Sequence, residues 1–283
     1  MSILMESFDG RPAGISLTMD DQGTPAFMQV ARPPFVYLDH SRLMNLAEGY
    51  AERFATALER CNGTAALSWL NILELTNPSG STFAFSNDLF LRLFPRVAFI
   101  EVLPDVVIEH ENMVLAGKPA PGDPKLDGPL LKAFAAHSRE GVNPMDPRGF
   151  LSAFREQREE LKRTWLKASA RIQTITKAAK ASGSFPKEPG RMPCLPRPTR
   201  WVTWKATSHL IEEVNLDDLN NFPDFFHTVV PISNCDFTVL DKQWAEVARQ
   251  IDGYLARKEL PRLPGTVFRH EEELVERLES VAS

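Results

Sequence analysis

The chain has 283 residues, of which 43% are hydrophobic and 24% are charged, and its formal net charge is -5. This composition excludes a disordered or fibrous protein, and the length suits one large domain or a domain with a sizeable insertion. The three cysteines form no C-x-x-C pair, and the sequence has no signal peptide and no run of about 18 apolar residues. We therefore expect a reduced, cytoplasmic protein with no membrane partner.

The predicted elements begin after an N-terminal extension, residues 1–34, in which Gly and Pro interrupt any periodicity. The run Phe-Val-Tyr-Leu at 35–38 predicts a buried strand, and residues 41–60 follow with helical spacing. Residues 65–67 predict a second short strand, after which Ser68 can cap a helix. The sequence of strand and then helix therefore occurs twice.

The middle of the chain is less regular. Residues 83–93 predict a helix, and 97–107 form an apolar stretch that suits a strand or a buried loop. Residues 117–147 are rich in Pro, Gly and Asp, which is typical of a linker. The longest helical pattern follows at 150–181, and its polar face is basic. We interpret 105–200 as a basic, Pro-rich and helical insertion.

The last part of the chain returns to alternating elements. A helix is predicted over 223–232, a buried strand over 236–240 and a helix over 243–256. A short strand at 266–268 and an acidic helix at 270–281 complete the pattern. Strands that alternate with helices predict an α/β fold with a central parallel sheet flanked by helices.

The predicted sheet domain is discontinuous. Its first part is residues 35–104 and its second part is residues 201–283, with the insertion 105–200 between them. Residues 148–205 contain 14 Lys and Arg against 4 Glu, so this stretch carries +10 and the remaining residues together carry -15. Such asymmetry is typical of a protein that meets a polyanion with one surface, although a solvated helix face has the same composition. The candidate nucleic-acid-binding residues are Arg155, Arg158, Lys162, Arg163, Lys167 and Arg171.

Four acidic residues are expected at one edge of the sheet. Asp39 and Asp241 directly follow predicted strands, and the carboxyl ends of parallel strands meet at one crevice. Glu74 and Asp224 lie on helices that can reach the same edge. Crowded carboxylates repel one another, which costs stability unless a divalent cation lies between them. Hard cations prefer oxygen ligands, so Mg²⁺ or Mn²⁺ is the expected cofactor.

The local sequences around these acids also match a known pattern. Val-Tyr-Leu-Asp ends at Asp39, Ser-Trp-Leu-Asn-Ile-Leu-Glu runs from Ser68 to Glu74, and Asp224 and Asp241 lie seventeen residues apart across a helix and a strand. Taken together in this order, the chain resembles the PIN-domain ribonucleases, a family of metal-dependent nucleases on a Rossmann-like sheet. The resemblance leaves more than a third of the chain uncovered, including the basic insertion.

The resemblance implies a PIN-like fold and a Mg²⁺- or Mn²⁺-dependent endoribonuclease. The four acids would ligate one or two ions that activate a water for attack on the phosphodiester. Ser68, His227 and Lys242 would support the site: Ser68 as a neighbouring polar group, His227 by holding a carboxylate or phosphate, and Lys242 by touching the substrate or balancing the charge of the acids. RNA is the implied partner, with DNA as the alternative, and a homodimer and an antitoxin or other regulatory protein are further partners that the family suggests.

Other interpretations of these residues stay open at this point. Capping of the next helix could be the whole role of Asp39, and His227 could be a packing residue. A catalytically degenerate PIN-like scaffold that binds nucleic acid or regulates another protein would keep the fold without turnover. A Rossmann-like module for a nucleotide is the third class, but the chain has no Gly-rich phosphate loop.

Overall fold

A central sheet of five parallel strands forms the middle of the computed structural model, which describes residues 3–4, 13–19, 25–77, 82–118, 127, 147–190, 197–218 and 221–282. The strands are β4 (Phe35–Leu38), β5 (Thr64–Leu67), β6 (Val97–Phe99), β7 (Phe237–Val239) and β8 (Thr266–Phe268). They lie in the order β6-β5-β4-β7-β8. The predicted α/β class with a central parallel sheet is confirmed, and the strand order is consistent with a Rossmann-like fold.

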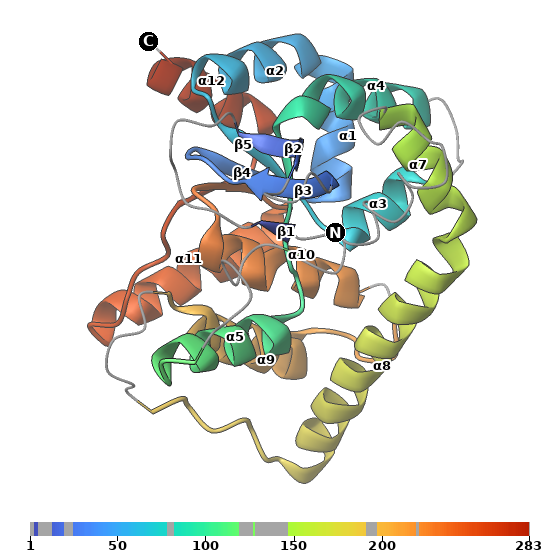
Figure 1. Cartoon of the computed structure of the whole chain (residues 1–283). Coiled ribbons are helices and arrows are strands. Elements are labelled where there is room, and N and C mark those ends of the chain that lie inside the picture. Colours follow the sequence, from blue (N-terminus) through green and yellow to red (C-terminus); the bar gives the residue numbers. More distant parts are fainter. Residues whose placement is uncertain are drawn as a thin grey trace.

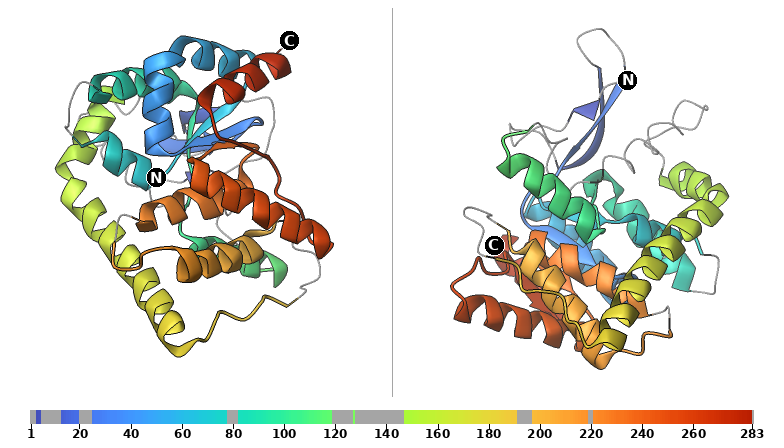
Figure 2. Two further views of the ribbon diagram at one scale, coloured as in Figure 1. Left: turned by 180° about the vertical axis from the view of Figure 1, so that it is seen from behind. Right: turned by 90° about the horizontal axis from the view of Figure 1, so that it is seen from below.

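Helices cover both faces of the sheet (Figure 1). One face carries α1 (His40–Gly49), α2 (Ala51–Arg60), α4 (Thr82–Leu93) and α12 (Glu271–Ala282), and the other carries α10 (Asn221–Asn234) and α11 (Lys242–Arg257). Figure 2 shows α5 (Pro104–Leu115) and α9 (Thr199–Glu213) packed on the outer side of α10 and α11. The chain passes from α7 (Pro147–Glu156) into α8 (Arg158–Ser182), which runs along one side of the molecule. The short α3 (Trp69–Leu75) packs against both of these helices. No helix in the described part of the chain has both the length and the apolar character needed to cross a bilayer.

The strands are apolar along their whole length because helices cover both faces. Every residue of β4 and β5 is buried, and Val36 and Tyr37 have no exposed surface. The helices contribute large side chains to the same core, among them Trp201 of α9 and Phe225 of α10. This packing holds the loops at the strand ends in fixed positions, as a site at the sheet edge requires.

The order of the strands creates one special position at the sheet edge. Going along the sheet from β4, the next strand in sequence lies on one side (β5) and the later strand β7 lies on the other. The connections from β4 and β7 therefore leave in opposite directions, and open α/β sheets bind their ligands beyond the strand ends at such a switch point. The residues that follow β4 and β7, Asp39 and Asp241, lie at this switch point.

The N-terminal residues are more regular than predicted. In place of an irregular extension over 1–34, the described residues form a second small sheet of β1 (Ile3–Leu4), β2 (Gly14–Met19) and β3 (Pro25–Val30), with β2 antiparallel to β3. β2 packs against β6 and the short 3₁₀ turn Phe94–Arg96. Gly14 has φ +105° and its Cα faces the carbonyl oxygen of Pro95, which a Cβ would approach to 2.2 Å. The glycines that interrupt the periodicity of this segment therefore include one required for close packing.

The segments predicted as long helices are helical, but each of the two longest is divided into two helices. The helix predicted over 41–60 is two helices, which meet at Tyr50 with φ -134° and ψ 10°. The helix predicted over 150–181 is also two, α7 and α8, which meet at Gln157. The apolar stretch 97–107 is strand only to Phe99 and then becomes the start of α5. Hydrophobic spacing continues across such breaks, so it cannot locate them.

The run Trp-Val-Thr-Trp at 201–204, directly after the predicted insertion, lies inside the helix α9. Its β-branched and aromatic residues pack against α10 and α11, and tertiary packing overrides their strand propensity. Most of the linker predicted at 117–147 lies outside the described residues.

Candidate active site

Asp39 and Asp241 have almost the same local structure. Asp39 is the N-cap of α1 with φ -64° and ψ 169°, and Asp241 is the N-cap of α11 with φ -62° and ψ 169°. In each case Oδ1 accepts a hydrogen bond of 2.8 Å from the third backbone N–H of the helix, that of Arg42 or of Trp244. Asp39 Oδ1 also accepts from the hydroxyl of Ser41 at 2.8 Å. The capping interpretation of Asp39 is therefore correct, but it occupies one carboxylate oxygen only.

A third helix begins at the same edge. Ser68 follows β5 and caps α3, and its hydroxyl and backbone N–H both donate to Asn71 Oδ1 at 2.9 Å. Asn71 Nδ2 in turn donates to the carbonyl of Leu38, which ties α3 to the end of β4. The N-termini of α1, α3 and α11 thus all begin where parallel strands end. Helix N-termini carry partial positive charge, so this edge favours anions.

Glu74 extends from α3 toward two histidines. His227 of α10 approaches Glu74 Oε2 with its Nε2 at 3.4 Å, and His40 Nδ1 lies 4.0 Å from the same oxygen. His227 is 2% exposed, so its ring is enclosed by the core. Among the described residues, no aligned hydrogen bond reaches Glu74 Oε2 or His227 Nε2. The contact is an ion pair with spare acceptor capacity on the carboxylate.

A chain of hydrogen bonds fixes the proton positions on His227. Asn71 Oδ1 can only accept, so the Ser68 hydroxyl donates to it, and the Ser68 oxygen must then accept from the Tyr37 hydroxyl at 3.2 Å. The Tyr37 oxygen is consequently left to accept from His227 Nδ1, which lies 2.5 Å away. Nδ1 therefore carries a proton, and the opposite nitrogen, Nε2, faces the carboxylate of Glu74.

The electrostatics agree with a positively charged His227. Burial alone would lower the pKa of His227, but the charges of Glu74, Asp39 and Asp224 raise it above its ordinary value. Burial also raises the pKa of Tyr37 well above its ordinary value, so its hydroxyl keeps the proton that it donates. The acidic cluster around His227 thus favours the protonated form of this buried ring. Of the two roles predicted for it, holding a carboxylate is what the geometry supports.

Asp224 shows how closely the four acids are coupled. It lies in the first turn of α10, where burial raises its pKa from 3.8 to about 6. The charge of Asp241 is the next cause, and Asp39 and Glu74 add to it, while His227 opposes them. Burial likewise raises the pKa of Asp39, against the opposing charge of His227. The structure therefore brings all four predicted acids close enough to interact.

The acids do not form a closed metal shell as they stand. Within the described residues, no group of three or more His, Cys, Asp or Glu side chains has the arrangement of a metal centre. The cluster is instead a set of carboxylates around one buried histidine, held by capping bonds and by the chain of hydrogen bonds from Tyr37. The atoms of this cluster that could bind a metal ion are carboxylate oxygens and histidine nitrogens.

Sequence reasoning missed three residues of this cluster. Tyr37 belonged to a run interpreted only as an apolar strand, although a tyrosine with no exposed surface needs a partner for its hydroxyl. Asn71 lies three residues after Ser68 and could have been recognised as part of a capping box. His40 follows Asp39 directly and was not considered. Asp236, which precedes β7, has a structural role, since its Oδ2 accepts from the backbone N–H of Phe35 at 2.7 Å.

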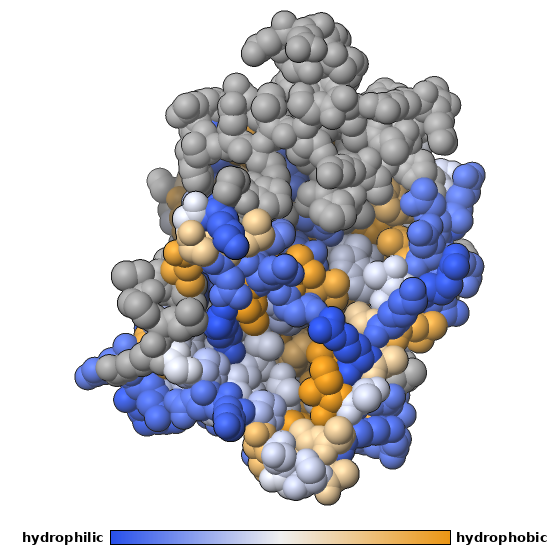
Figure 3. Space-filling view, turned by 60° about the horizontal axis from the view of Figure 1, so that its bottom comes forward, coloured by the Kyte–Doolittle hydropathy of each residue, from blue (hydrophilic) through white to orange (hydrophobic). Residues whose placement is uncertain are grey.

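The predicted nucleic-acid-binding residues lie on α7 and α8. Figure 3 shows a hydrophilic band along the edge of the molecule where α8 runs. Lys162, Arg163 and Lys167 are exposed there. Arg171 instead pairs with Asp105 at 2.7 Å, and Arg158 is half-buried beside Glu159 at 4.0 Å. Arg155, the last of the set, is exposed near the end of α7.

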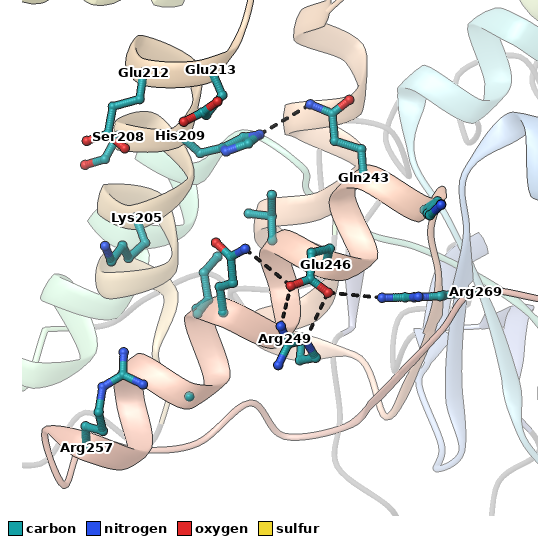
Figure 4. Close-up of a pocket in the computed structure, with 15 residues that line it drawn as sticks. Lys205, Ser208, His209, Glu212, Glu213, Gln243, Glu246, Arg249, Arg257 and Arg269 are labelled. Atoms are coloured by element: carbon teal, nitrogen blue, oxygen red, sulfur yellow. Dashed lines mark hydrogen bonds and ion pairs between the residues drawn. The ribbon is translucent and has the colours of Figure 1, made fainter.

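Lys242, the remaining predicted residue, begins α11 directly after Asp241. Its side chain is exposed, and no described acid forms an ion pair with it. It lines a groove between α9 and α11 (Figure 4). Comparisons of the chain with protein-family models, with curated proteins and with solved structures found no match.

Proposed function

We propose that this chain is a Mg²⁺- or Mn²⁺-dependent nuclease on a PIN-like scaffold, which hydrolyses phosphodiester bonds in RNA. The observation that carries the proposal is the cluster of Asp39, Glu74, Asp224 and Asp241 at the switch point between β4 and β7, where burial and the charges of the other acids raise the pKa of Asp224 to about 6. Glu74 is paired with His227, but no described cation forms an ion pair with the other three acids, and carboxylates that only stabilised the fold would be paired or spaced apart. Clustered acids with a perturbed pKa are typical of a functional site.

The donor atoms of the described residues, though not arranged as a metal centre, suit a hard divalent cation in their chemistry. Glu74 has a buried oxygen that no described residue reaches by a hydrogen bond, and Asp39 and Asp241 each use only Oδ1 for capping. These three acids and Asp224 would hold the ion or ions through oxygen. When bound, the cation would supply Lewis-acid activation of water and stabilisation of the leaving oxygen.

The remaining residues of the cluster keep the acids in place. His227 holds the position of Glu74 through the 3.4 Å ion pair, and Tyr37 and Ser68 hold the ring of His227 in one orientation. The caps at Asp39 and Asp241 fix these two carboxylates relative to the sheet. The three helix N-termini at this edge favour a phosphate group, because their free N–H groups carry partial positive charge.

Cleavage of labelled single-stranded RNA and DNA tests the proposal. We expect the purified chain to cut RNA internally with Mn²⁺ or Mg²⁺, to cut DNA more slowly, and to lose activity in EDTA. Cleavage that persists at the same rate in EDTA contradicts a metal-dependent mechanism. RNA binding without any turnover would instead favour the alternative, a degenerate scaffold that binds nucleic acid.

A further inference from the structure

A groove lies between α9 and α11, outside the carboxylate cluster. Its volume is about 1040 Å³, which is at the upper end of the range for small-ligand sites. Figure 4 shows that α9 contributes Lys205 and His209 and that α11 contributes Gln243, Glu246 and Arg257. A groove of this size between two helices suits a chain-like ligand better than a single small molecule.

One end of the groove adjoins the acidic cluster. Lys242 lines the groove and follows Asp241 directly, and the charge of Asp241 acts on Asp224. Arg257 lies at the other end of α11, and the helical rise of 1.5 Å per residue places it about 22 Å from Lys242. At roughly 3.4 Å per stacked nucleotide, that length accommodates about six nucleotides.

The charges are distributed unevenly along the groove. Glu246 is neutralised by Arg249 and by Arg269, which approaches it to 3.1 Å (Figure 4). Lys205 and Arg257 are cations at the end far from the cluster, and no described acid forms an ion pair with Arg257. The one described acid on which Lys205 is shown to act, Glu188, already pairs with Lys258 at 3.4 Å and accepts from the hydroxyl of Tyr254. The end near the cluster carries its own acids, Glu212 and Glu213. The distal end is therefore the part that attracts an anionic strand.

Aromatic rings hold Lys205 from behind the groove. The rings of half-buried Trp204 and buried Tyr254 lie 5.4 Å apart, and the Lys205 ammonium is 5.3 Å from each ring centroid. These cation–π contacts position the ammonium, and neither ring lines the groove. His209, further along α9, does line it; its ring is half-buried and stands edge-on to Trp244. A positively charged groove that contains a planar side chain suits single-stranded nucleic acids, which bind through phosphate contacts and base stacking.

A glycine on the floor of the groove is a separate observation. Gly253 lies inside α11 and lines the groove, although glycine weakens a helix interior. The nearest atom to a Cβ built there is Nη1 of Arg257 at 3.5 Å, so no neighbouring residue requires a glycine at this position. A missing side chain lets a ligand approach the helix backbone closely.

We propose that the groove between α9 and α11 binds the single-stranded RNA on one side of the cleavage point, with Lys205 and Arg257 as its distal phosphate contacts. This inference rests on the proposed nuclease function, because that function requires the bound RNA strand to extend from the groove into the carboxylate cluster. The groove itself is defined by its own residues.

The test measures binding and cleavage separately. Binding of a fluorescent RNA of about 12 nucleotides is followed by anisotropy in EDTA over a range of salt concentrations. We expect Lys205→Gln with Arg257→Gln to raise the Kd about tenfold and to reduce the slope of log K against log salt by about 1.4, or 0.7 for each lost phosphate contact. Gly253→Leu should weaken binding as well, because leucine fills the groove while favouring the helix.

Matched controls remove the same charge elsewhere. Arg60→Gln with Arg277→Gln acts on exposed residues of α2 and α12, on the opposite face of the sheet, and should leave binding unchanged. Lys162→Gln with Lys167→Gln acts on α8. If the α8 pair weakens binding and the groove variants do not, the groove proposal is overturned.

The cleavage measurement separates the two proposals. The groove variants should hydrolyse bis(p-nitrophenyl) phosphate with Mn²⁺ as fast as the wild type, because this diester is too small to reach the distal groove. Groove-dependent RNA binding without metal-dependent cleavage of either substrate supports the groove and overturns the nuclease function. If the protein cleaves RNA but none of the three groove substitutions changes its affinity for RNA, the groove proposal is overturned and the nuclease proposal is not.

Discussion

Asp39→Asn should slow Mn²⁺-dependent RNA cleavage by about 100- to 1,000-fold, the range observed when one group that stabilises transition-state charge is removed. Asn is also a good N-cap, so it can keep the bonds from Ser41 and the backbone of Arg42. The substitution therefore removes a charge from the cluster and leaves α1 capped. Initial cleavage rates together with the thermal unfolding midpoint measure the two effects.

The matched control for this prediction is Asp88→Asn. Asp88 is an exposed acid on α4, and its charge is not among those that act on Asp224. The control should cleave RNA at the wild-type rate. If Asp39→Asn cleaves as fast as the control while its unfolding midpoint is unchanged, Asp39 has only its capping role and the proposed mechanism is wrong.

Asp224→Asn should stabilise the metal-free protein at pH 7.5. The difference between a pKa of 3.8 and one of about 6 corresponds to at most about 3 kcal/mol of unfavourable free energy when Asp224 is ionised in the folded state. Removing the charge removes this cost, and the variant should also lose cleavage activity. Urea unfolding in EDTA measures the stability, and cleavage with Mn²⁺ measures the activity.

The pH dependence of this difference follows from the direction of the pKa shift. Because the folded-state pKa of Asp224 is raised, the folded state binds a proton that the unfolded state releases between about pH 4 and pH 6. The wild type therefore loses stability as the pH rises through this window, and the stabilising effect of Asp224→Asn grows over the same range. Below about pH 4 the two proteins should be equally stable.

A different outcome would change the account of the site. If Asp224→Asn is destabilising at pH 7.5, the carboxylate makes favourable contacts that outweigh its repulsion from Asp241, Asp39 and Glu74. Functional sites typically contain residues that lower stability but support activity. The stability and the activity of Asp224→Asn together test whether Asp224 is such a residue.

The sequence allowed the sheet edge and its acids to be predicted, because both follow from local patterns. Short apolar runs located β4 and β7, and an acid after each run could be placed at the carboxyl edge without tertiary information. Ser68 was predicted to begin a helix from its residue type and position, and it does. Glu74 was expected to reach this edge because its apolar neighbours place it on a packed helix.

Contacts between distant segments could not be predicted in the same way. His227 meets Tyr37 across 190 positions of sequence, and the proton arrangement depends on Ser68 and Asn71 as well. The groove requires α9, for which no element was predicted, to pack along α11. The N-terminal sheet depends on the fit of Gly14 against Pro95. In each case tertiary packing, which periodicity does not encode, decides the structure.

Calorimetric titration of Mn²⁺ into the metal-free protein at pH 7.5 tests the central claim, that the four carboxylates form a divalent-cation site. We predict that the wild type binds Mn²⁺ and that Asp241→Asn, in which Asn can keep the cap of α11, binds it at least about tenfold more weakly. Asp88→Asn should titrate like the wild type. Equal binding by the wild type and Asp241→Asn, or no binding by either, would contradict the claim.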